Sequence, residues 1–271
     1  MRIVNGLIEA KELLSEGRGL DLVTVPPHVQ ATIDRVFGEP LTPSEAVTRI
    51  LGMVRADGDA AIRKLTLDIE GVELAAIEVS AEEIDVGYDS TDPRVIEALE
   101  VSAERVGRFH TAAKAQAWMD FNEGYGALVV PCGRVGIYVP GGTAPLPSTV
   151  IMSAVPARVA GVPEVILCTP SEKNGKPNPV TLAAAKIAGV DRVFGIGGAQ
   201  AIAAMAYGTE STPAVDMICG PGNLFVTLAK KMLYGEVGID GLYGPTETLV
   251  IADDTANATL CAADLLAQAE H

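Results

Sequence analysis

The pattern of hydrophobic and polar positions along the chain changes near Val135. Before it, apolar residues recur at helical spacing over 47–54, and a similar face continues over 62–69 after an interruption at Gly58. The same spacing over 95–113 predicts a second, longer amphipathic helix. Between them, residues 79–83 predict a short strand end that runs into a helix cap. The N-terminal part is therefore expected to be largely helical and charged.

After Val135, short apolar runs alternate with helical segments. The predicted strands are 134–139, 164–168, 192–196, 215–219 and 249–252, and the predicted helices are about 148–160, 180–188, 201–207, 224–233 and from about 258 onward. The strands are continuously apolar, which is typical of a parallel sheet covered on both faces. The expected fold class is therefore α/β with a parallel sheet and an N-terminal helical segment.

The composition of the chain limits the kinds of partner that it is expected to bind. The 271 residues include 35 acidic and 20 basic side chains, for a formal net charge of −15, and only 4% are aromatic. A field of that sign repels phosphate backbones, and few rings are present to stack on bases, so a nucleic-acid partner is not expected. No apolar run approaches the roughly 18 residues of a membrane span, and the N-terminus lacks the apolar core of a signal peptide. These features predict a cytoplasmic protein with no membrane partner.

The four cysteines are widely spaced and form no CxxC pair. They are Cys132, Cys168, Cys219 and Cys261. This spacing disfavours a disulfide framework or a cysteine-rich zinc site, and the cysteines are interpreted as small buried side chains.

Three glycine-containing turns each follow a predicted strand and open a predicted helix, at 140–142, 197–200 and 220–223. Ligands bind at the carboxyl edge of parallel sheets, where helix N-termini present unpaired N–H groups to anions. Gln200 and Asn223 stand where a side chain would point at such a ligand. The alternative is that these are only tight turns, with Asn223 as a helix cap. Because Gln200 occupies the position of the third glycine of G-x-G-x-x-G, the residues alone do not identify a dinucleotide.

The last predicted helix carries Gln268 and His271, which are three residues apart and share a face. They are either metal ligands or a solvent-facing helix end. Asp264 and Glu270 nearby are either supporting groups or surface charge. Glu247 is a lone carboxylate at a turn, a position more typical of a cap than of a catalyst. The remaining histidines, His28 and His110, are isolated, and His110 is interpreted as structural.

A series of motifs after residue 134 follows the order found in one enzyme family. They lie at 135–142, 144–150, 197–203, 208–211, 220–223, 244–247 and 264–271, with a looser match at 55–61. On these motifs the chain resembles the histidinol dehydrogenases. The resemblance implies oxidation of L-histidinol to L-histidine through the aldehyde, the last step of histidine biosynthesis, with two NAD molecules used in turn and one zinc ion per site.

The resemblance also implies an architecture. The family has two similar, incomplete Rossmann-like parallel-sheet domains, the second inserted into the first, in an intertwined homodimer. Residues 1–134 would then be N-terminal helices and the first part of domain 1. Residues 135–245 would form the inserted domain, and 246–271 would return to domain 1, which is incomplete within this chain.

Several positions match functional positions of the family. Tyr138, Gln200 and Asn223 match its NAD-contacting residues. Thr246 stands in place of a substrate-contacting serine and keeps a hydroxyl while adding a methyl group. Gln268 and His271 match two zinc ligands that also lie at the substrate.

The resemblance assigns no catalytic acid/base residue within 1–271. It places an Asp and a His that complete the zinc shell, and an acid/base Glu–His pair, beyond His271. The chain alone is therefore expected to carry only part of the active site and to be inactive. One alternative is a sibling dehydrogenase acting on another small alcohol, such as a sulfonated diol, favoured by Thr246 and by 242–243. Another is a fragment without catalysis that binds only a nucleotide.

Overall fold

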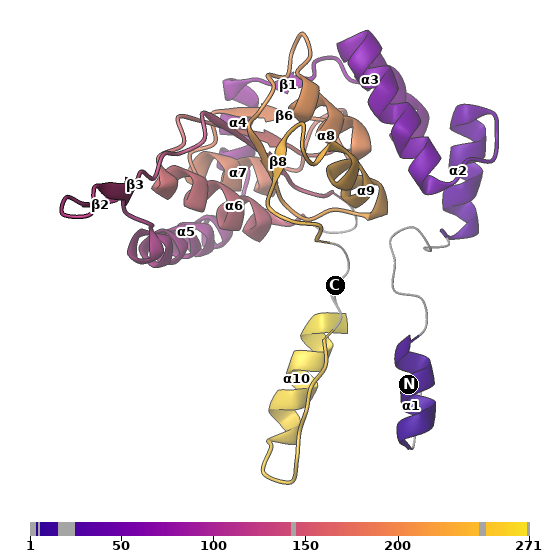
Figure 1. Ribbon diagram of the computed structural model, residues 1–271. Helices are drawn as coiled ribbons and strands as arrows, with labels where there is room; N and C mark the ends of the chain where they lie inside the picture. The colour runs from indigo at the N-terminus through magenta and orange to yellow at the C-terminus, as the bar shows by residue number, and fades with distance from the viewer. Residues whose placement is uncertain (1–3, 5, 16–24, 142–144, 244–247, 270–271) are drawn as a thin grey trace.

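The computed structural model describes residues 4, 6–15, 25–141, 145–243 and 248–269. It is an α/β protein whose main body is one sheet covered by helices on both faces (Figure 1). The helical elements are α1 (Leu7–Ser15), α2 (Pro27–Phe37), α3 (Pro43–Leu65), the π-helical turn η2 (Thr66–Glu70), α4 (Ala81–Asp89), α5 (Pro93–Ala113), α6 (Pro147–Ala160), α7 (Pro179–Ile187), α8 (Gly198–Tyr207), α9 (Leu224–Leu233) and α10 (Ala258–Ala269).

The sheet has six strands in the order β1-β6-β5-β4-β7-β8. These are β1 (Glu78–Val79), β4 (Arg134–Tyr138), β5 (Glu164–Cys168), β6 (Arg192–Phe194), β7 (Met217–Cys219) and β8 (Gly238–Ile239). Only β1 is antiparallel to its neighbour. From β4 the chain builds β5 and β6 on one side and then returns to place β7 on the other. The strand order therefore reverses between β4 and β7, which is where open α/β sheets bind ligands.

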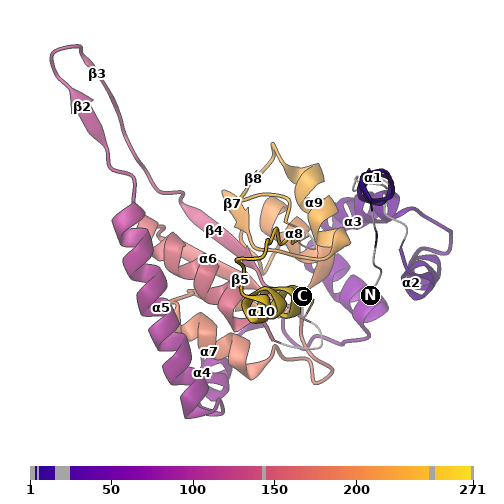
Figure 2. The same ribbon diagram turned by 90° about the horizontal axis from the view of Figure 1, so that it is seen from below.

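Each face of the sheet has its own core. Tyr138, Ile166 and Ile218 point toward a cluster formed with α3, α8 and α9. Val135 and Ile137 point the other way, toward α6 and α7, which are in turn covered by α4 and α5 (Figure 2). Successive strand residues alternate between these two cores, and both cores are apolar, which explains the unbroken apolar runs in the sequence.

The N-terminal helices are tied to the sheet by polar contacts as well. Helix α3 starts with a capping box at Thr42 and changes direction at Gly58. Just after this bend, the Asp59 N–H donates to Glu210 Oε2 at 2.8 Å, and Thr209 Oγ1 donates to Asp59 Oδ1 at 2.6 Å. The loosely matched motif at 55–61 is thereby joined to the motif at 208–211.

Most elements predicted after residue 134 are confirmed, including β5 and α9 at their expected bounds. The strand predicted at 249–252 is wrong: this segment is extended but pairs with no described strand, and Leu249 and Ile251 are 79% and 90% exposed. The helical face over 95–113 is confirmed as α5, although Phe109 at its end is exposed. The sequence did not predict α2 or the hairpin of β2 (Trp118–Asp120) and β3 (Tyr125–Ala127).

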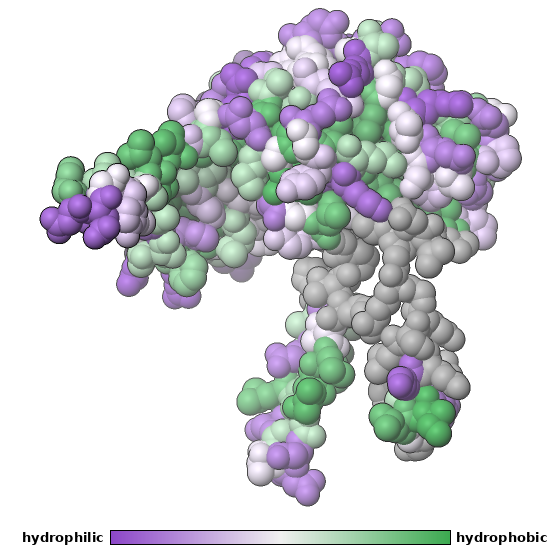
Figure 3. Space-filling model, viewed as in Figure 1, coloured by the Kyte–Doolittle hydropathy of each residue, from purple (hydrophilic) through white to green (hydrophobic). Residues whose placement is uncertain are grey.

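Three described parts of the structure extend away from the main body. The β2–β3 hairpin projects beyond α5 (Figure 2), and α1 and α10 stand apart from the sheet (Figure 1). Apolar side chains are exposed on all three, as the green surfaces in Figure 3 show. Within the described ranges, no helix is both long and apolar enough to cross a membrane. The division at 134 and 245 and the insertion of one domain into another remain predictions.

Candidate functional site

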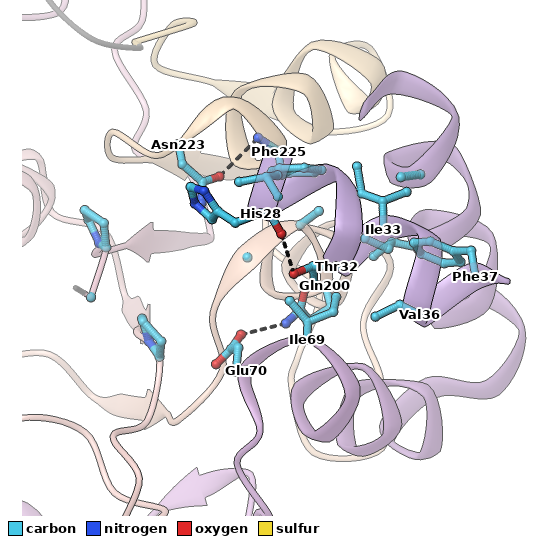
Figure 4. Close-up of a pocket in the computed structure, with 18 of the residues that line it drawn as sticks. His28, Thr32, Ile33, Val36, Phe37, Ile69, Glu70, Gln200, Asn223 and Phe225 are labelled. Carbon is cyan, nitrogen blue, oxygen red and sulfur yellow. Dashed lines mark hydrogen bonds between the residues drawn. The ribbon is translucent and has the colours of Figure 1, made fainter. Parts of the chain in front are cut away.

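A cavity of about 480 Å³ opens at the carboxyl edge of the sheet, beside the point where the strand order reverses. Its walls come from α2, α3 and η2, from the end of β4, from residues that follow β4 and β5, and from the N-terminal turns of α8 and α9. Figure 4 shows most of the side chains that line it. Tyr138, Gln200 and Asn223 all line it. The structure thus brings together three sequence-predicted residues that are up to 85 positions apart.

Tyr138 ends β4 and is buried between the sheet and α8. Its hydroxyl accepts a hydrogen bond from the Gly198 N–H at 3.1 Å. Burial raises the pKa of Tyr138 well above its usual range, and the negative charge of Glu70 acts in the same direction. The phenol therefore stays neutral and holds the first turn of α8 against the end of β4.

Gln200 lies in the first turn of α8 and is only 1% exposed. Its Nε2 donates to Glu70 Oε1 at 2.9 Å, as the dashed line in Figure 4 shows. Glu70 is the last residue of η2. Burial raises the pKa of Glu70 to about 7, and the hydrogen bond from Gln200 partly opposes this rise. A carboxyl group that titrates near neutral pH therefore faces the cavity.

Asn223 is the N-cap of α9. Its Oδ1 accepts hydrogen bonds from the N–H groups of Phe225 and Val226, both at 3.1 Å. The helix-cap interpretation of Asn223 is therefore correct for its oxygen. Since the cap uses only that oxygen and no described residue accepts from Nδ2, the amide nitrogen is available to a ligand in the cavity.

The loop that carries Asn223 begins at Gly220, which has φ +114° and lies tightly against β4. A Cβ at this position would lie 2.1 Å from the Tyr138 carbonyl oxygen. The Gly220 N–H donates to Asp240 Oδ2 at 2.8 Å, and Lys230 Nζ donates to the Gly220 carbonyl at 2.9 Å. Lys230 is buried and also pairs with Asp240. The Lys230–Asp240 pair therefore binds both backbone polar groups of Gly220 and holds the loop in place.

Sequence reasoning missed several residues of this site. Glu70 and His28 line the cavity but come from helices that carry no ligand-binding motif. Only tertiary packing brings them to the sheet edge, so no local signal could have found them. The Lys230–Asp240 pair did leave a signal, because Lys230 interrupts an otherwise apolar helix face at a position that proves to be buried.

The structure does not bring together the residues predicted to bind zinc and substrate in the way that it brings together those predicted to bind NAD. Gln268 lies on α10, where its Oε1 accepts a hydrogen bond from Thr248 Oγ1 at 2.8 Å, and it is not among the residues that line the cavity. Asp264 is exposed on the same helix. Thr246, Glu247, Glu270 and His271 lie outside the described residues. Within the described ranges, no three His, Cys, Asp or Glu side chains form a group suited to a metal ion.

The cysteines are all free, but only Cys168 is fully buried, whereas the other three are partly exposed. Burial raises the pKa of Cys168 well above its usual range and that of Cys219 to about 12. Both stay protonated at neutral pH, so neither is an activated nucleophile.

Comparison with known proteins extends this picture. The family model for histidinol dehydrogenase matches residues 40–271. The whole chain aligns with histidinol dehydrogenases of Deinococcus radiodurans, at 49% identity, and Dehalococcoides mccartyi, at 47% identity, and spans 62% of the length of each. A crystal structure of histidinol dehydrogenase from Elizabethkingia anophelis superimposes with a TM-score of 0.81 at 36% identity, covering 91% of this chain and 58% of that one.

Proposed function

Because this chain belongs to the histidinol dehydrogenase family, we propose that it supplies the NAD-binding part of an enzyme that oxidises L-histidinol to L-histidine. In this proposal the dinucleotide occupies the cavity at the carboxyl edge of the sheet. A cytoplasmic homodimer, expected from the family, belongs to the same proposal.

One observation carries the proposal. The three side chains that the family resemblance assigns to NAD meet at one cavity, and that cavity lies at the reversal of strand order. The polar groups there suit a dinucleotide: an amide donor at Asn223, an amide oxygen at Gln200 and the N-terminal turns of α8 and α9. Apolar side chains such as Ile33 and Phe225 provide walls for flat rings.

The residues of the chain have separate tasks in this proposal. Bound NAD supplies the hydride acceptor. Asn223 Nδ2 donates to the dinucleotide while its oxygen keeps α9 capped. Gln200 is oriented by Glu70, so that its own amide oxygen accepts from the ligand. Tyr138 holds the α8 turn in place without changing its protonation state. These contacts position the cofactor, and such positioning contributes to catalysis by fixing the geometry of the reacting groups.

Zinc belongs to the proposal through Gln268 and His271. Two neutral donors are fewer than a catalytic zinc site requires, and the described residues offer no group of three ligands. The remaining zinc ligands and the acid/base pair are proposed to come from the part of the family sequence that this chain does not span.

The test separates the two roles of Asn223. Asn223→Ser keeps an oxygen that caps α9 but removes the amide donor, whereas Asn223→Ala removes both. Calorimetric titration of NAD into chain 1–271 is expected to show binding that Asn223→Ser weakens by about 5- to 10-fold. The free energy of unfolding should be nearly unchanged in Asn223→Ser and about 1 kcal/mol lower in Asn223→Ala.

Two outcomes contradict the proposal. One is that chain 1–271 binds no NAD. The other is that Asn223→Ser binds NAD as tightly as the unaltered chain, which would leave Asn223 as a cap alone. Histidinol as the substrate is tested separately, by NAD reduction in a complete protein that carries this sequence, with a panel of other small alcohols as competitors.

A further inference from the structure

The carboxyl group of Glu70 is the one acidic side chain among the described residues that line the cavity, and no lysine or arginine lines it. Lys230, on α9, is committed to the Gly220 carbonyl and to Asp240. Among the described residues, a ligand group with a double negative charge would therefore meet a carboxylate in this cavity and neither a lysine nor an arginine.

One oxygen of Glu70 is already occupied and the other is not. Oε1 accepts from Gln200 Nε2 at 2.9 Å. No described residue donates to Oε2. An ionised carboxylate has acceptor capacity for several donors, so Glu70 retains a site for hydroxyl groups of a ligand. The contact with Gln200 fixes the direction of the carboxyl group in Figure 4.

Glu70 also lies beside the carboxyl ends of two strands of the sheet. A Cβ at Gly197, after β6, would lie 3.0 Å from Glu70 Oε1 and 2.7 Å from Pro170 Cβ. Pro170 follows the end of β5, so Glu70 is adjacent to the carboxyl end of the second parallel strand. In dinucleotide-binding sheets an acidic residue near this strand end binds the ribose 2′-hydroxyl. Here the first acid after β5 is Glu172, which is exposed, accepts a hydrogen bond from Asn178 Nδ2 at 2.9 Å and is not among the residues that line the cavity. The acid that does line the cavity, Glu70, is supplied by η2 from outside the sheet.

We propose that Glu70 is a specificity-determining residue that selects a dinucleotide with a free 2′-hydroxyl on the adenosine ribose. It accepts a hydrogen bond from that hydroxyl and repels a 2′-phosphate in the same place. This inference rests on the proposed function, namely that NAD occupies this cavity.

The experiment compares NAD with NADP in calorimetric titrations of chain 1–271 at pH 8. The unaltered chain should bind NAD at least about 10-fold more tightly than NADP, because a 2′-phosphate would face a like charge. Glu70→Gln keeps an oxygen for Gln200 and removes the charge. It should reduce the NAD/NADP ratio at least about 5-fold, mainly by binding NADP more tightly. Glu73→Gln removes the same charge from an exposed position nearby and should leave the ratio unchanged.

A second binding measurement uses the unaltered chain alone. The unaltered chain should bind 5′-AMP more tightly than adenosine 2′,5′-bisphosphate, so the inference stays testable if Glu70→Gln folds poorly. An unchanged NAD/NADP ratio in folded Glu70→Gln, or equal binding of the two adenosine nucleotides, overturns the role of Glu70 while NAD binding itself stands. If neither NAD nor NADP binds, the proposed function fails, and the role of Glu70 fails with it.

Discussion

The carboxyl edge of the sheet and helix α10 both carry residues that the family resemblance assigns to chemistry, but they are held in different ways. At the sheet edge, Tyr138, Gln200 and Asn223 each hydrogen-bond to a neighbouring group, and Tyr138 and Gln200 are buried. Helix α10 has no buried residue, and the contact described for Gln268 is with Thr248 on an exposed segment.

The difference shows what a ligand site needs from its support. Side chains at the sheet edge have their directions fixed by packing and by hydrogen bonds before any ligand arrives, so little ordering is required on binding. Helix α10 contributes no residue to either apolar core, so its position relative to the sheet is not fixed by core packing. We therefore expect NAD to bind through contacts at the sheet edge, and zinc to need ligands in addition to Gln268 and His271.

The largest expected effect comes from filling the space at Gly220. In Gly220→Ala the new Cβ would meet the Tyr138 carbonyl at 2.1 Å, and φ is +114°. The free energy of unfolding should fall by about 4 kcal/mol or more. Gly235→Ala is the matched control, since its φ is +109° but nothing lies within 4 Å, so only backbone strain of about 1–2 kcal/mol is expected. Urea denaturation measures the free energy of unfolding of both variants. Equal losses in the two variants would show that the Tyr138 carbonyl does not restrict the space at Gly220.

The second prediction concerns the buried ion pair. Lys230→Met keeps the length of the side chain but leaves Asp240 without its cation and the Gly220 carbonyl without its donor. The expected loss is about 3 kcal/mol in the free energy of unfolding. Lys231→Met, at the exposed neighbouring position, should cost less than about 1 kcal/mol. If Lys230→Met is as stable as Lys231→Met, the pair does not support the loop.

The third prediction is a pH dependence. The pKa of Glu70 in the folded protein is raised to about 7 from an ordinary value of 4.5. The folded state then holds the proton more tightly, so this group makes the protein less stable as pH rises from about 4.5 to 7. Glu70→Gln has no proton to lose. Relative to the unaltered chain, its free energy of unfolding should increase by up to about 3 kcal/mol between pH 5 and pH 8.

Urea unfolding at these two pH values measures that difference. Glu73→Gln, at an exposed position on the same part of the chain, serves as the control for replacing a glutamate by a glutamine. A constant difference for Glu70→Gln would mean that Glu70 titrates as an ordinary exposed carboxylate.

The smallest effect is expected from removing the C-terminal segment. Chain 1–243 lacks α10 but keeps all the described residues that line the cavity. Because α10 has no buried residue, the free energy of unfolding of the sheet should change by less than about 1 kcal/mol. A larger loss in denaturant unfolding would show that α10 packs on the sheet after all.

How much of this could be predicted from the sequence differs between the same two regions. The strands and turns from 134 to 233 were predictable because strand ends, glycine turns and helix starts follow one another locally. The run at 249–252 is equally apolar but forms no strand, because an apolar pattern does not specify a pairing partner.

The residues of the candidate site likewise divide into those that a local sequence pattern indicates and those that only tertiary packing brings in. Gln200 and Asn223 are the last residues of the turns at 197–200 and 220–223, and they were found from that position. Glu70 lies 130 residues before Gln200, and only the packing of α3 against α8 and α9 brings η2 to the cavity. No local pattern encodes such a contact, so the sequence indicated one wall of the cavity and not the other.

The cavity at the sheet edge is proposed to supply the NAD contacts by itself, whereas zinc is proposed to need more ligands than Gln268 and His271. Parallel calorimetric titrations of NAD and of Zn²⁺ into chains 1–271 and 1–243 distinguish the two cases. We expect saturable NAD binding of equal affinity in both chains, and zinc binding that is weak and the same in both. The assignment is overturned if neither chain binds NAD, or if 1–271 binds zinc tightly and 1–243 does not.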